Sequence, residues 1–70
     1  MEEVLIVTRD ENGKRTNHYI LWDRVCSYVD DNDFGEEDEI LLVIVEGTCI
    51  YSALGTSFSL CWDEITGFFA

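Results

Sequence analysis

The sequence contains no proline, and neither lysine nor arginine occurs after Arg24. Its four cations stand against fifteen Asp and Glu residues, so the formal net charge is −11 on 70 residues. A small domain usually remains soluble with a net charge of about 2–8 in magnitude, and charge self-repulsion destabilises a compact state. The excess of negative charge therefore indicates a functional role, and the simplest such role is binding to a cationic partner. Like-charge repulsion argues against direct binding to nucleic acid or to anionic lipid.

Motifs of catalytic and metal sites are also missing. His18 is the only histidine, and no phosphate-binding loop, nucleophile elbow or H-E-x-x-H motif is present. Cys26, Cys49 and Cys61 lack the C-x-x-C spacing of a structural zinc site and the spacing of a disulfide framework. We predict three free thiols, no cofactor, no metal and no enzymatic activity.

Targeting segments are not recognisable either. The start, Met1-Glu2-Glu3, is acidic where a signal peptide needs a cationic region. The longest apolar run, Ile40 to Val45, is far too short to span a bilayer. We predict a cytoplasmic protein without a membrane association.

Apolar residues make up 47% of the chain and include nine aromatics, which is too many for a disordered acidic tail. A chain of 70 residues buries only about 60% of the surface that it exposes when unfolded. The prediction is one folded domain, 1–70, with a small core.

Strand-like segments occur in both halves. In the first, 4–8 leads through Asn12-Gly13, a hairpin signal because both residues tolerate positive φ, into 18–22. In the second, 40–45 turns at 46–48 into 49–54, and 57–62 alternates with period two as a further short strand. The run 40–45 is apolar on both faces, which indicates a central strand or one whose second face is covered by another subunit.

A short motif ends each half. Residues 22–29 (WDRVCSYV) recur as 62–69 (WDEITGFF), with apolar side chains at the i, i+3, i+4 spacing of a short helix. Asp23 and Asp63 are predicted N-caps whose charge suits the helix dipole. The order ββα-ββ(β)α predicts an α+β fold, with a small antiparallel sheet of four to five strands, two short helices on one face, and a possible internal duplication.

Acidic residues form the main candidate site. Seven carboxylates fall within ten residues, a density of about one charge per 5 Å of extended chain, close to that of a single nucleic-acid strand. The alternative is a solvated loop that serves solubility. The predicted partner-binding residues are Asp30, Asp31, Asp33, Phe34, Glu36, Glu37, Asp38, Glu39, Glu46, Asp63 and Glu64.

The acidic segment also contains a partial match to a calcium-binding loop and one aromatic residue, Phe34. An EF-hand starting at Asp30 fails, because positions five and twelve are Phe34 and Leu41, which offer no side-chain oxygen. Phe34 is either an exposed anchor for a partner or a core residue that pins the loop.

The other aromatics are predicted to lie in the core, because a small domain needs them to bury enough area. The apolar end, 67–70, either closes the core or meets a partner or second subunit. The aromatics predicted to lie more often in the core than in a contact are Trp22, Trp62, Tyr19, Tyr28, Phe58, Phe68 and Phe69.

In size, charge and cytosolic character the chain resembles the phage-encoded DNA-mimic inhibitors, anti-CRISPR proteins among them. That resemblance implies an inhibitor in the host cytoplasm that blocks the basic groove of a CRISPR effector, or of another host defence, repair or transcription protein. Two alternatives remain. One is a protein-interaction module, such as an antitoxin, an immunity-type protein or a small assembly subunit. The other is a homodimeric domain whose acids serve solubility.

Overall fold

The computed structural model describes residues 2–32, 38–56 and 58–69. The elements follow in the order β1 (Glu3–Arg9), β2 (Arg15–Leu21), η1 (Trp22–Arg24), α1 (Val25–Asn32), β3 (Glu39–Val45), β4 (Thr48–Ser52), β5 (Leu60–Cys61) and α2 (Trp62–Phe69). This is the predicted α+β fold with its predicted element order.

All strand pairs are antiparallel, and the sheet has the order β2-β1-β3-β4, with β5 beside the beginning of β3. The central pair joins the first strands of the two halves, and each half places its second strand outside. The arrangement therefore relates β1 to β3 and β2 to β4, as an internal duplication would. It also confirms that the apolar run 40–45 is a central strand.

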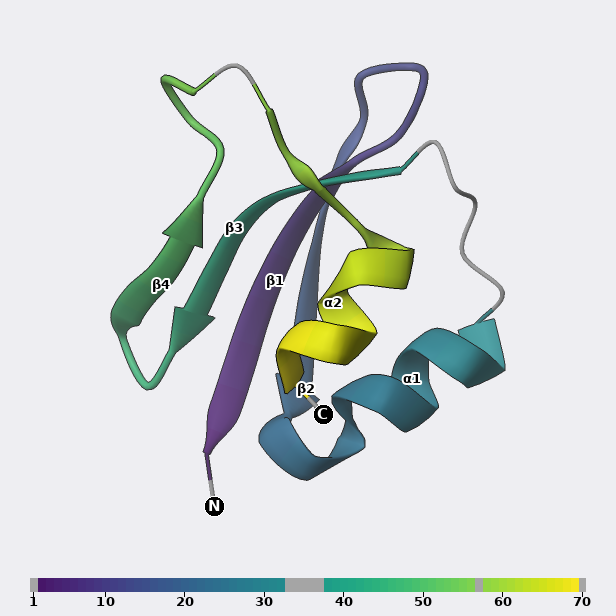
Figure 1. Ribbon diagram of the computed structural model, residues 1–70, viewed down its shortest axis with the longest axis vertical. Coiled ribbons are helices and arrows are strands. Elements are labelled where there is room, and N and C mark those ends of the chain that lie inside the picture. Colours follow the sequence, from purple (N-terminus) through teal and green to yellow (C-terminus); the bar gives the residue numbers. More distant parts are fainter. Residues whose placement is uncertain (1, 33–37, 57, 70) are drawn as a thin grey trace.

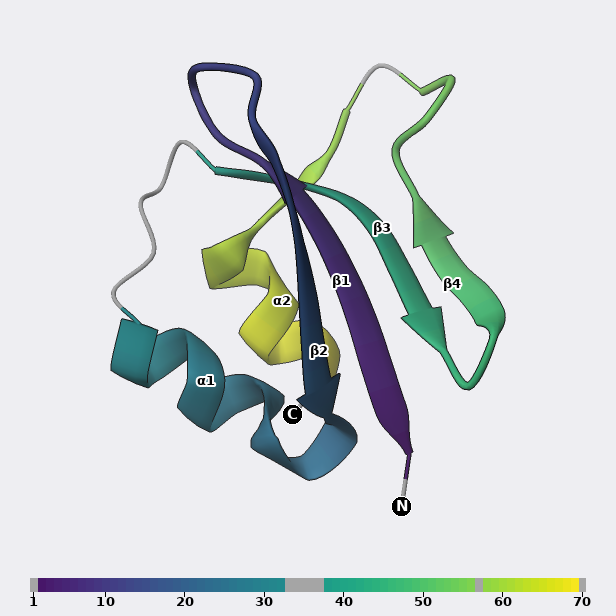
Figure 2. The same ribbon diagram turned by 180° about the vertical axis from the view of Figure 1, so that it is seen from behind.

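Both helices cover one face of the sheet, and the other face is open along β1, β2 and β3 (Figures 1 and 2). The core lies between the sheet and the helices. Alternate strand residues point into the core from the sheet, and the apolar stripe of each helix covers the core from the opposite side. Its buried apolar members are Val4, Ile6, Ile20, Val25, Ile40, Val43, Trp62, Ile65 and Phe69.

The aromatics divide between core and surface, so the prediction of a core position was wrong for Tyr19 and Phe58. Trp62 and Phe69 are buried, whereas Tyr19, Phe58 and Phe68 are 65%, 66% and 45% exposed. A single helix layer covers only one sheet face, and Tyr19 alternates with buried His18 and Ile20 onto the open one. The apolar C-terminus closes the core through Phe69, whose ring lies 4.7 Å from that of Trp22.

The predicted N-caps are a second correction. Leu21 is the N-cap of η1 and no side chain caps it, while Asp23 lies inside that 3₁₀ turn. Asp63 likewise lies in the first turn of α2, because the helix already begins at Trp62. The carboxylate charge still lies at the positive end of the α2 dipole, so only the capping role is lost.

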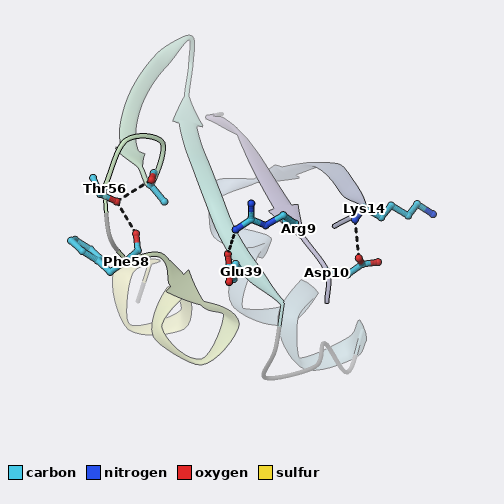
Figure 3. A network of polar contacts seen from close by, with 7 residues as sticks. Arg9, Asp10, Lys14, Glu39, Thr56 and Phe58 are labelled. Atoms are coloured by element: carbon cyan, nitrogen blue, oxygen red, sulfur yellow. Dashed lines mark hydrogen bonds and ion pairs between the residues drawn. The ribbon is translucent and has the colours of Figure 1, made fainter. Parts of the chain in front are cut away.

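The first hairpin turn also differs from the prediction. Of Asn12 and Gly13 only the glycine has positive φ (+82°), and its N–H donates to the carbonyl of Asp10 at 3.0 Å. The Asp10 carboxylate accepts from the N–H groups of Asn12 and Lys14, both at 2.9 Å, and so holds the turn (Figure 3). In the second hairpin Glu46 and Gly47 both have positive φ, +48° and +81°, as a type I′ turn requires.

This geometry predicts opposite outcomes for one substitution at two glycines. Gly47→Ala is expected to lower the free energy of unfolding by about 1 kcal/mol, because φ of +81° strains any residue with a Cβ. Gly67→Ala, inside α2 with nothing within 4 Å of the new Cβ, is expected to raise it by up to about 1 kcal/mol. Urea unfolding of both variants measures the difference, and equal effects would contradict the assigned turn.

Candidate functional site: an acidic edge over a buried histidine

Five of the predicted site residues gather along one side of the molecule. Asp30 and Asp31 lie in the last turn of α1, Asp38 precedes β3, and Asp63 and Glu64 lie in the first turn of α2. The end of α1, the start of β3 and the start of α2 lie toward the same side in both views (Figures 1 and 2). We call these five carboxylates the acidic edge.

His18 links the elements that carry the acidic edge. Its ring nitrogens lie 3.0 Å from the hydroxyl of Thr8 and 2.9 Å from that of Tyr28, two residues before Asp30. The ring also meets the edge of Trp62, the neighbour of Asp63, at a centroid distance of 5.3 Å. One side chain on β2 therefore contacts β1 and the start of α2 and reaches α1.

Two opposing effects set the pKa of His18. Burial lowers the pKa below its usual value near 6.5, and the charge of Asp38 raises it by a smaller amount. The net shift is downward, so the ring is neutral near pH 7. A neutral imidazole has one donor and one acceptor nitrogen, and the hydroxyls of Thr8 and Tyr28 are able to take either role.

A pH dependence of stability follows from this shift. The unfolded chain binds a proton at His18 near pH 6.5, whereas the folded chain binds it only at lower pH, so the free energy of unfolding is expected to fall as the pH drops below about 6.5. Carboxylates ordinarily protonate nearer pH 4, so they contribute little to the change in stability between pH 7.5 and 5.5. Urea unfolding from pH 7.5 to 5.5 measures the slope. His18→Gln is the control, since the chain has no other histidine; a slope that survives it would contradict this assignment.

Cys61 shares the electrostatic field of the acidic edge. Desolvation raises the pKa of its thiol, and so do the neighbouring carboxylates Glu64, Asp63 and Glu39. Glu39 is the strand partner of Cys61, and Asp63 and Glu64 follow in the first turn of α2, so all three carboxylates lie around the β5–α2 junction. Cys26, Cys49 and Cys61 are free thiols, as predicted.

Glu39 and Glu46, also predicted to bind the partner, are not counted in the acidic edge. Glu39 lies beside it, next to Cys61, but its charge is compensated. Glu39 forms an ion pair with Arg9 across β1 and β3 (Figure 3). Glu46 lies in the β3–β4 turn, at the other end of β3. Asp33, Phe34, Glu36 and Glu37, also predicted to bind the partner, lie outside the described residues.

The sequence offered one signal for His18, its alternation with Ile20 in a strand, but none for its contacts. Thr8, Tyr28 and Trp62 come from three other elements, and only the fold assembles them. Residues 2–32, 38–56 and 58–69 contain no group of three or more His, Cys, Asp or Glu placed to hold a metal ion. Within the same ranges, no helix has the length and apolar character needed to cross a membrane.

Comparisons of the chain with models of protein families, with curated proteins and with solved structures gave no match.

Proposed function

We propose that the protein is a small inhibitor whose acidic edge occupies the basic groove of a nucleic-acid-binding protein and excludes DNA or RNA. The predicted target class is a CRISPR effector or another host defence, repair or transcription protein, in the cytoplasm. The observation that carries the proposal is the placement of Asp30 and Asp31 at the C-terminal end of α1, where no basic side chain accompanies them.

Carboxylates at the C-terminal end of a helix destabilise that helix. The C-terminal end of a helix carries a partial negative charge, and each added negative charge there costs about 0.3–1 kcal/mol. Asp63 and Glu64, at the opposite end of their helix, gain a similar amount. Folding therefore accounts for Asp63 and Glu64, whereas Asp30 and Asp31 lower stability and need another explanation.

The helix layer carries almost no compensating charge. Segments 22–32 and 62–69 contain five carboxylates and a single cation, Arg24. Arg9, Lys14 and Arg15 lie on or beside the β1–β2 hairpin. An uncompensated acidic surface steers a basic groove toward it and accelerates association at low salt. Lys and Arg side chains arranged for phosphates also accept carboxylates through charge-assisted hydrogen bonds.

The second candidate is an interaction module of the antitoxin, immunity or assembly-subunit type. It is favoured by apolar side chains outside the core, since Leu54, Phe58 and Phe68 are 54%, 66% and 45% exposed. Such a module binds chiefly through apolar contact, so its complex withstands salt. A complex held by the acidic edge weakens as salt screens the charges.

The test is a capture experiment with two competing eluents. The immobilised chain is incubated with bacterial lysate, and bound protein is eluted with a salt gradient or with duplex DNA. We expect a nucleic-acid-binding protein that both eluents release, and whose DNA binding the free chain then inhibits. A partner that resists DNA and molar salt would refute the inhibitor and support the module.

A further inference from the structure

The face of the sheet opposite the helices is apolar at its centre. Adjacent rows cross it, one formed by Tyr19, Leu5 and Ile44 and the other by Val7 and Leu42 with Asn17 and Ser52 at the edges. Tyr19 is 65% exposed, and neither helix covers this face (Figure 2). Apolar side chains thus line both faces of β1 and β3, although only one face meets the core.

Charges on this open face are few, and they balance. By strand alternation its ionisable residues are Glu3, Arg9, Arg15 and Glu39, two of each sign. Arg9, Arg15 and Glu39 lie together beside the β1–β2 turn, where Glu39 is ion-paired with Arg9 and Arg15 leaves this end with a net charge of +1. Glu3 lies at the other end, where its carbonyl accepts from the N–H of Glu46. In a chain of net charge −11, this face is neutral, with a cationic end and an acidic end.

We propose that the open sheet face is the interface of a symmetric homodimer. A two-fold axis between the sheets and perpendicular to the strands lays β1 of one copy over β1 of the other, running oppositely. The cationic end of each face then meets the acidic end of the other, and Glu3 lies toward Arg15 of the second copy and toward its ion-paired Arg9. The apolar rows pack at the centre, and the helix layers face outward.

Charge complementarity selects a second copy as the occupant. A basic partner is drawn to the acidic edge instead, because the open face has no net charge to attract it. Two copies at −11 repel each other, and this geometry keeps their acidic helix layers as far apart as any face-to-face contact allows. Because the dimer is two-fold symmetric, the contact between the cationic end of one copy and the acidic end of the other occurs twice.

The available area supports a weak dimer. β1, β2 and β3 have seven residues each and β4 has five. At about 3.3 Å per residue and 4.8 Å between strands, the face measures roughly 20 by 23 Å. Two such faces bury on the order of 1,000 Å², the lower limit for a specific interface. We expect half-dissociation at roughly 10–100 μM.

Sedimentation equilibrium over a range of concentrations tests this dimer. Tyr19→Lys is expected to weaken it at least about tenfold, because a lysine charge would be buried in an apolar interface. Phe68→Lys is the matched control: it alters net charge equally but lies on α2, in the opposite layer, and should leave the dimer unchanged. Circular dichroism establishes that both variants are folded.

The wild-type chain provides a second test that needs no variant. Salt screens the repulsion between two acidic chains, so the dimer is expected to tighten as salt rises, while binding to a basic target weakens. The dimer proposal and the inhibitor proposal can therefore be refuted independently of each other. A wild-type chain that stays monomeric at several hundred micromolar, a dimer loosened by salt, or equal weakening by Tyr19→Lys and Phe68→Lys would each overturn the proposal.

Discussion

Replacing Asp30 and Asp31 by asparagine is expected to stabilise the protein while weakening its binding to the target. Both carboxylates lie in the last turn of α1, where the helix dipole opposes them. Their removal should raise the free energy of unfolding by a few tenths of a kcal/mol to about 1 kcal/mol for each. Exposed charge pairs contribute about 0.2–1 kcal/mol each, so the two changes together should weaken binding by roughly tenfold at low salt.

Asp63→Asn with Glu64→Gln is the matched control. It removes the same number of charges from the same edge, but from the end of α2 where the dipole favours them. Target binding should weaken to a similar extent, whereas the free energy of unfolding should now fall. Urea unfolding and the salt concentration that elutes the captured target measure the two effects. Loss of stability in Asp30→Asn/Asp31→Asn, or unchanged binding in both variants, would contradict the role assigned to the acidic edge.

Trp62→Ala is expected to lower the free energy of unfolding more than any other single substitution considered for this protein. The side chain is 2% exposed, belongs to the core cluster and meets the ring of His18. Truncation of a buried tryptophan costs about 3–5 kcal/mol. At about 0.05–0.15 kcal/mol per residue, a chain of 70 residues has only roughly 4–10 kcal/mol of stability, so one substitution removes much of it.

Trp22→Ala is the corresponding control, because Trp22 holds the equivalent place in the first half of the chain. It is only partly buried, against the edge of Phe69, so its truncation should cost less than half as much. Circular dichroism during urea unfolding reports both variants, and the remaining tryptophan provides a fluorescence signal in each. A stable, fully folded Trp62→Ala protein would show that the core does not depend on this side chain.

Element order was predictable because local patterns determine it. The apolar run in 40–45 marked β3 as central. The i, i+3, i+4 patterns of 25–29 and 65–69 marked the helix faces toward the core, which was correct except for the exposed Phe68. Helix starts were less predictable. Asp23 and Asp63 have the chemistry of N-caps, but α2 already begins at the buried Trp62, two residues before the start that an Asp63 N-cap would give.

The candidate site was predictable only in part. Acidity along residues 30–39 is visible in the sequence, but its union with Asp63 and Glu64 depends on β5 pairing with β3. The same tertiary contacts remove Glu39, through its ion pair with Arg9, and leave Glu46 at the other end of the sheet. No local pattern reports such partners, because they come from distant parts of the chain.

The sequence by itself determined the net charge, the position of the cations before residue 25, the alternation of the strands and the apolar stripes of the helices. These are properties of composition and of local periodicity, which exist before folding. Tertiary structure decided which of the two sheet faces the helices cover, and so which apolar residues remain exposed and which carboxylates share an edge. A strand with two apolar faces is satisfied by burial on either side, and only the packing of α1 and α2 selects one.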